Sequence, residues 1–144
     1  MTRKLMVILT LMLAGRMMTL AFIHRAGGDG PGDPPLVWLM PLVGDAVVGV
    51  TGLAIVWLIL RQIGLMAWTA IVGWNVIGIW DALSAFVISQ TAPWPDFFML
   101  QIFGSSMFFL ASAMHALLIW LAFRPEIRAH FLGADAAGTC PHTA

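Results

Sequence analysis

Residues 65–88 constrain the fold most strongly, because this stretch is long and apolar enough to cross a bilayer yet contains Asn75 and Asp81. Inside lipid, a carboxylate or an amide must find its partners within the protein. The rest of the chain is therefore expected to supply those partners. The composition agrees with this setting, since 60% of the 144 residues are hydrophobic, 10% are charged and the mean hydropathy is +0.92. These values are typical of an integral membrane protein.

Other apolar stretches accompany this one, and turn-forming sequences separate them. The predicted membrane spans cover about residues 5–23, 36–60, 65–88 and 97–123. A loop rich in Gly, Pro and Asp follows the first span, and the connection RQIG is short enough to make the second and third spans antiparallel neighbours. We predict an all-α, polytopic membrane protein, a four-transmembrane-helix bundle that forms a single domain over residues 1–132.

The two ends of the chain are interpreted from their sequence. The first apolar stretch is expected to be a membrane helix rather than a cleaved signal peptide, because Arg16 interrupts it and no small-residue cleavage site follows closely. Pro125 ends the last span, and residues 126–132 are predicted to form a short interfacial helix. Residues 133–144 are predicted to be a flexible tail. Cys140 is the single cysteine, so no intrachain disulfide is expected.

Basic residues near the ends of the spans predict the orientation. Those expected on one side are Arg3, Lys4, Arg61, Arg124 and Arg128, against Arg25 on the other. The positive-inside rule then places both termini in the cytoplasm, and we expect a multi-pass protein of the cytoplasmic or inner membrane of a bacterium. Lys and Arg number seven and so do Asp and Glu, so no attraction to nucleic acid is expected.

Three charged side chains are predicted to share one level in the membrane. Counting the helical rise from the middle of each span places Arg16 roughly 3 Å, Asp45 roughly 4–5 Å and Asp81 roughly 7 Å outward of the midplane. Unpaired charges at this depth are costly, so we expect Arg16 to pair with Asp45, Asp81 or both. A guanidinium stays protonated and can donate to two carboxylates, which leaves one carboxylate free to bind a proton or a cation.

Helical spacing assigns other polar residues to faces. Asp45 shares a face with Gly49 and Gly52, whose small size allows a neighbouring helix to come close. On the fourth span a polar line is predicted, consisting of Gln101, Ser105, Ser112 and His115. The same depth count places Asn75 near the midplane and His115 roughly 7–8 Å toward the cytoplasm, away from the charged level.

These residues together define a candidate ligand or proton site. Its predicted members are Arg16, Asp45, Asn75, Asp81, Gln101, Ser105, Ser112 and His115, with Trp74 and Trp80 as candidate pocket-lining side chains. Aromatic walls around a few convergent polar groups are typical of small-ligand sites.

The sequence names no cofactor. A metal site made of Asp45, Asp81 and His115 is disfavoured by their separation in depth. Haem held by two histidines would need His24 at the opposite membrane face, and retinal would need a lysine within a span. The cofactor is therefore unknown.

The leading functional hypothesis is that the buried polar site binds or transports a small solute, a lipid headgroup or an ion, with proton coupling as one version. The first alternative is a non-catalytic accessory or scaffold subunit, whose polar residues fix helix register within a homo-oligomer or a membrane complex. The second is an intramembrane enzyme that uses paired aspartates, although a non-catalytic role is favoured. The lipid bilayer is an expected partner of all three.

Two partial resemblances bear on these alternatives. Residues 43–45 and 80–81 are faintly similar to the GxGD and YD signatures of the presenilin-like proteases, but the first glycine is absent and the order along the chain is reversed. The chain also resembles the multidrug transporters with four short helices in size and hydropathy. Arg16 stands in the first span, where those transporters rely on a membrane glutamate.

Overall fold

A computed structural model describes residues 1–94 and 96–133 of the chain. These residues contain helices and no strand, which confirms the predicted all-α class. The predicted tail lies outside the described residues except for Gly133. This glycine directly follows the last helix and has a positive φ of 84°.

The helical elements follow one another with short connections. They are α1 (Thr2–Ala14), the 3-10 segment η1 (Gly15–Thr19), α2 (Leu20–Ile23), the 3-10 segment η2 (Leu36–Trp38), α3 (Leu39–Arg61), α4 (Leu65–Thr91), α5 (Phe98–Phe103), α6 (Ser106–Ala122) and α7 (Pro125–Leu132). Pro41 lies in the first turn of α3, where its missing N–H is tolerated, and Pro125 occupies the first turn of α7.

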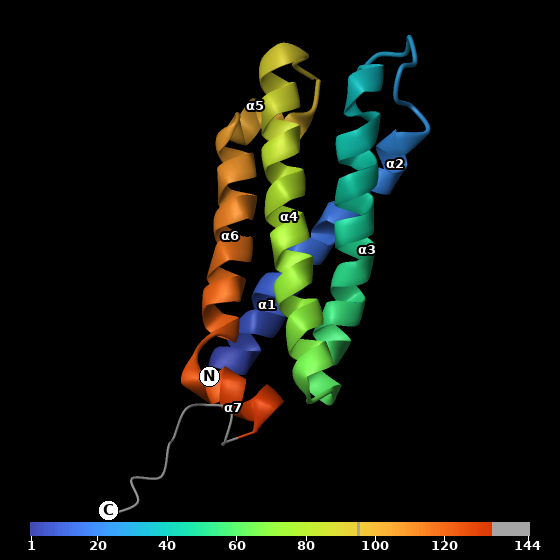
Figure 1. The fold of residues 1–144 in the computed structure, drawn as a ribbon. Coiled ribbons are helices and arrows are strands. Elements are labelled where there is room, and N and C mark those ends of the chain that lie inside the picture. Colours follow the sequence, from blue (N-terminus) through green and yellow to red (C-terminus); the bar gives the residue numbers. More distant parts are fainter. Residues whose placement is uncertain (95, 134–144) are drawn as a thin grey trace, which may run out of the picture.

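The long helices α3, α4 and α6 run side by side, and the segment α1–η1–α2 crosses them diagonally (Figure 1). Along this diagonal α1 contacts both α6 and α3, whereas η1 and α2 pack on α3. The N-terminus, the α3–α4 turn and α7 lie at one end of the bundle. We call it the basic end, because the five basic residues near its helix ends are Arg3, Lys4, Arg61, Arg124 and Arg128. The opposite end carries the Gly/Pro-rich loop and α5, and we call it the loop end.

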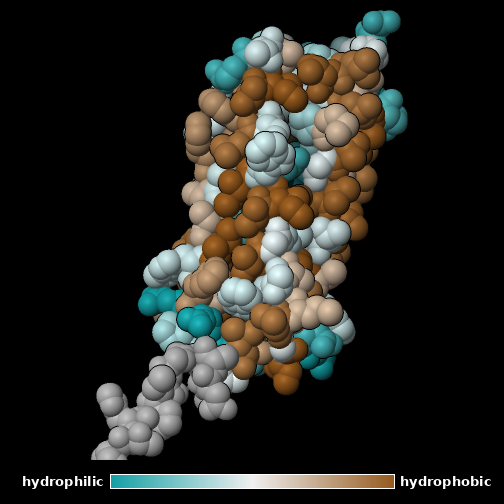
Figure 2. All heavy atoms as spheres, in the orientation of Figure 1, coloured by the Kyte–Doolittle hydropathy of each residue, from teal (hydrophilic) through white to brown (hydrophobic). Residues whose placement is uncertain are grey.

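Three helical stretches are long and apolar enough to cross a membrane. They are Thr2–Ile23, Leu36–Arg61 and Leu65–Thr91, and a fourth results if α6 and α7, bent by 66° at their junction, are counted as one span. The visible face of the bundle is mostly hydrophobic along its length, with hydrophilic residues gathered at its two ends (Figure 2). The chain is therefore a multi-pass membrane protein with three or four candidate spans.

The prediction of one unbroken helix over 97–123 is wrong. Gly104 adopts φ of 55°, a conformation that side-chain-bearing residues rarely take, and it separates α5 from α6. The remaining helix α6 has 17 residues. This break also moves the centre of the helix from residue 110 to residue 114, which matters for the position of His115.

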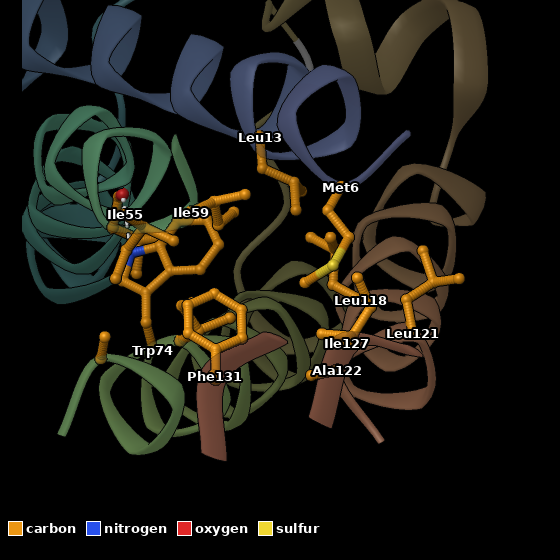
Figure 3. Packing of buried hydrophobic residues seen from close by; sticks show 13 residues of the cluster. Met6, Leu13, Ile55, Ile59, Trp74, Leu118, Leu121, Ala122, Ile127 and Phe131 are labelled. Carbon is orange, nitrogen blue, oxygen red and sulfur yellow. Dashed lines mark hydrogen bonds between the residues drawn. The ribbon is translucent and has the colours of Figure 1, made fainter. Parts of the chain in front are cut away.

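Buried apolar side chains form two clusters at different levels of the bundle. The basic-end core comprises Met6, Leu13, Val48, Ile55, Ile59, Ala67, Ile71, Trp74, Leu118, Leu121, Ala122, Ile127 and Phe131 (Figure 3). The loop-end core comprises Trp38, Leu42, Ala85, Trp94 and Phe108. Helix α7 closes the basic-end core through Ile127 and Phe131, and its last turn is fixed by the bond from Gly64 N–H to Phe131 O at 2.7 Å.

Candidate functional site

The charged and polar side chains within the bundle lie between its two apolar cores. Four helical segments carry one such polar side chain each, and in each segment the chain contributes to the basic-end core on one side of it and contacts the loop-end core on the other. The positions are Arg16 between Leu13 and Phe22, which packs against the loop-end core, Asp45 between Val48 and Leu42, Asp81 between Trp74 and Ala85, and His115 between Leu118 and Phe108. Apolar packing therefore borders this layer on both sides.

Arg16 is presented by η1, the tight turn that follows α1. The Thr19 hydroxyl donates to Arg16 O at 2.8 Å, within η1, and also lies 3.2 Å from Leu42 O on α3. The local 3-10 turn is thereby tied to the neighbouring helix. The Arg16 side chain, 14% exposed, points into the bundle.

Small residues on α3 allow η1 to come this close. A Cβ placed on Gly49 would overlap the backbone of Met17, and one on Gly52 would lie 3.2 Å from Ala14 Cβ. The face predicted for Asp45, Gly49 and Gly52 is thus the face that η1 and α1 contact. This close crossing brings the Asp45 carboxylate to the Arg16 side chain.

Arg16 bonds to two carboxylates from different helices. Its Nε donates to Asp45 Oδ1 at 2.5 Å, and its Nη2 contacts both Asp45 Oδ1 and Asp81 Oδ2. Asp45 comes from α3 and Asp81 from α4, so this ion cluster joins three helical segments. One positive and two negative side chains give it a formal charge of −1 when both carboxyl groups are ionised.

The remaining nitrogen of the guanidinium faces neutral acceptors. Arg16 Nη1 lies 3.3 Å from His115 Nε2 and 3.5 Å from Gly78 O. Each of the three guanidinium nitrogens therefore faces at least one acceptor within the bundle.

Bonding partners assign the tautomer of His115. Asn75 Nδ2 donates to Ile71 O at 2.8 Å, so the amide oxygen of Asn75 must face His115 Nδ1, 2.9 Å away. An oxygen there requires Nδ1 to carry the hydrogen, and the Arg16 donor requires a lone pair on Nε2. His115 is thus the neutral Nδ1–H tautomer.

Two further glycines and a tryptophan shape the cluster. A Cβ on Gly44 would overlap the Asp81 carboxylate, and one on Gly78 would overlap the His115 ring. Trp74 sets its edge against that ring, with centroids 5.0 Å apart, and donates to Val48 O at 3.2 Å, the bond dashed in Figure 3. The space that Gly44 leaves for the Asp81 carboxylate was not predicted from the sequence. The small size of Gly44, directly next to Asp45, could have indicated such a close approach.

The structure does not bring every predicted residue to the cluster. Gln101 is exposed on α5, and Ser105 lies at the α5–α6 break, where it accepts from Gln90 Nε2 at 3.1 Å. The predicted polar line is therefore broken, because Gly104 interrupts the helix that would carry it. Ser112 is on α6 with a buried hydroxyl that has no partner. Trp80 is 74% exposed and faces outward, so the prediction that it lines an internal pocket is wrong.

The predicted separation of His115 from the charged level is also wrong. His115 is fully buried and contacts Arg16 directly. Two features explain the difference: α6 is centred near His115, and α1–η1 crosses the other helices diagonally, so that counting residues along straight spans misplaces it. Among the residues that the structure describes, no three His, Cys, Asp or Glu side chains are placed to hold a metal ion.

Comparison with known proteins identifies no relative: no family model, curated protein or solved structure matches this chain. Function must therefore be inferred from the geometry of the bundle.

Proposed function

We propose that this membrane protein binds and releases a small cation, most simply a proton, at the Arg16–Asp45–Asp81 cluster, as the ion-binding step of a transport process. The observation that carries the proposal is that two carboxylates inside the bundle share one guanidinium, whose three nitrogens all face acceptors of the protein. A net negative charge held between apolar cores is costly in a medium of low dielectric constant. Uptake of one cation removes that charge.

A proton suits this site better than a larger solute. Two cavities of the described chain, about 220 and 310 Å³, are lined by residues other than those of the ion cluster. A proton needs no cavity. The Asp45 side chain is 23% exposed, compared with 11% for Asp81, so the cluster is reached most readily from the side of Asp45.

The test is a count of protons exchanged by the full chain in lipid vesicles. A pH step from about pH 5 to about pH 9 avoids most of the titration of exposed aspartates and arginines, and a pH dye reports the protons released. We expect D45N and D81N each to release about one proton fewer than the wild type, because each leaves a neutral Arg–Asp pair. The matched control is D33N, since Asp33 is ion-paired with Arg25 outside the membrane spans.

Equal proton release by the wild type, D45N and D81N would contradict proton binding. Repeating the step in sodium or potassium chloride separates the cations. Proton release that depends on the added metal ion indicates that this ion replaces the proton at the cluster.

We further propose that the basic end faces the cytoplasm, in a bacterial inner membrane. The support is the concentration of Arg3, Lys4, Arg61, Arg124 and Arg128 at that end. Reporter fusions at each terminus test this orientation. Activity of a periplasm-specific reporter at either terminus would contradict it.

A structural role within a membrane complex is the second candidate. It is favoured by the backbone contact between Gly49 and Met17, which the cluster holds in register. In that case D45N and D81N lower stability without changing proton release. Purification from native membranes would then recover a stoichiometric partner protein.

A further inference from the structure

A second candidate site lies at the loop end, away from the ion cluster. A cavity of about 220 Å³ opens there beside the break between α5 and α6. It is lined by Ser89, Pro93, Trp94, Leu100, Gln101, Gly104 and Ser105. The lining combines uncharged polar side chains with apolar ones. Its volume exceeds the roughly 30 Å³ occupied by one water molecule in the liquid, so a larger group fits.

The indole N–H of Trp94 is the polar group that indicates a ligand. Its side chain is 2% exposed, yet its indole N–H is buried and has no hydrogen-bond partner. An unpaired buried donor is costly, and more so within a membrane. An acceptor from outside the described chain would remove this cost.

Other inward-facing tryptophans show that the bundle normally satisfies such donors. Trp38 donates to Ala92 O at 2.7 Å, and Trp68 donates to Ala122 O at 2.9 Å. Trp74 also has an acceptor, as described above. Trp94 differs from these three in lining a cavity.

The surroundings of Trp94 restrict where an acceptor can approach. Phe97 stacks on the indole with ring centroids 4.7 Å apart, and Phe22 sets its edge against it at 5.2 Å. Trp38 covers it further at 5.8 Å. Aromatic rings thus pack around the indole, and Trp94 is also one of the residues that line the cavity.

The break at Gly104 adds a second attraction for an oxygen ligand. The cavity is lined by Gly104 and Ser105, directly before the first turn of α6, and the Ser105 side chain makes no capping bond. A helix N-terminus carries partial positive charge and favours anionic oxygens. The described lining contains no charged side chain that would compete for it.

We propose that this cavity binds the phosphate or ester oxygens of a phospholipid, with the Trp94 indole N–H as donor and the start of α6 as the positive pole. Tryptophan is enriched at the level of lipid headgroups, where this end of the bundle would lie. The mixed lining fits the glycerol region of a lipid, which has both polar and apolar parts. This site is independent of the proposed cation binding.

The test is native mass spectrometry of the full chain with added phosphatidylglycerol, comparing wild type, W94F and W57F. W94F removes the indole N–H but keeps an aromatic ring, and W57F is the matched control because Trp57 is exposed on the outside of α3. Loss of a hydrogen bond to a charged group predicts about a tenfold drop in lipid retention for W94F. We expect W57F and D45N to retain lipid like the wild type.

A second variant guards against misfolding of W94F. Ser89→Leu fills the cavity while leaving Trp94 in place, and we expect the same loss of lipid at unchanged thermal stability. Retention by both W94F and Ser89→Leu at the wild-type level would overturn the proposal. Inorganic phosphate is the second probe: binding of free phosphate in place of phosphatidylglycerol would overturn the assignment to a lipid.

Discussion

The ion cluster and the basic-end core are both buried, yet they are held by different forces. Met6, Ile59 and Leu118 in the core are fully buried and interact through packing alone. The ion cluster instead depends on hydrogen bonds and ion pairs of defined direction, because the nitrogens of Arg16 face acceptors from three other helices. Lipid tails are as apolar as leucine side chains, so apolar packing alone only weakly favours contact with one particular neighbouring helix over contact with lipid. Directional bonds supply that selectivity.

The largest effect is expected when the shared cation is removed. R16M leaves the carboxylates of Asp45 and Asp81 without their partner, which should destabilise the fold by about 3–5 kcal/mol. Thermal or denaturant unfolding in detergent measures this. The triple variant R16M/D45N/D81N, which carries no unpaired charge, should recover most of the loss, and R25M in the loop should resemble the wild type.

A smaller but clear effect is expected at the helix crossing. G49A places a methyl group against the backbone of Met17, where no flexible side chain can move aside, and should cost about 1–3 kcal/mol. G73A is the matched control, since nothing lies within 4 Å of a Cβ on Gly73 in the same bundle. A helical Gly→Ala change there should be neutral or mildly stabilising. Equal stability of the two variants would show that η1 does not cross α3 at Gly49.

Truncation in the basic-end core should matter less than loss of Arg16. L118A removes contacts of a fully buried side chain on α6, and we expect about 1–2 kcal/mol, because the favourable transfer from water that operates in soluble proteins is reduced in lipid. L117A, next to it and 38% exposed, should change stability by less than about 0.5 kcal/mol. If L118A costs as much as R16M, the contrast between core and cluster fails.

The smallest effect concerns an ion pair outside the membrane spans. The Gly30 backbone N–H, assisted by Arg25, lowers the pKa of Asp33 below its usual value of 3.8. A lowered pKa means that the ionised form stabilises the loop at neutral pH, and that this contribution is lost as the pH falls through the folded-state pKa. The protection factors of the loop amides, which are exchange rates corrected for the intrinsic rate at each pH, should fall on acidification below pH 3.8. D33N should show the lower protection already at neutral pH.

Much of the fold followed from residues whose placement in lipid is costly. The meeting of Arg16, Asp45 and Asp81 was predictable because charges at one depth must pair. The close approach of a neighbouring segment was predictable from Gly49 and Gly52, but not that η1 is this segment. Their role in binding a ligand or a proton stays a prediction. The number of complete spans and the orientation of the termini also stay predictions.

The rest depended on tertiary geometry. One glycine, Gly104, breaks the fourth span, and a glycine within an apolar pattern signals such a break only weakly. His115 reaches Arg16 because η1 crosses the bundle at an angle, which residue counting along parallel helices does not reveal. Trp80 faces outward because it lies about 100° around α4 from its buried neighbour Asp81.

The central claim is that the ion cluster carries an excess negative charge which a proton neutralises. The most direct measurement is the infrared band of protonated carboxyl groups in lipid-embedded protein between about pH 5 and about pH 9. We predict a band at the acidic end that is lost toward the alkaline end and is absent from both D45N and D81N. A spectrum in which neither substitution removes a protonated-carboxyl band would contradict the claim, because both aspartates would then be ionised throughout.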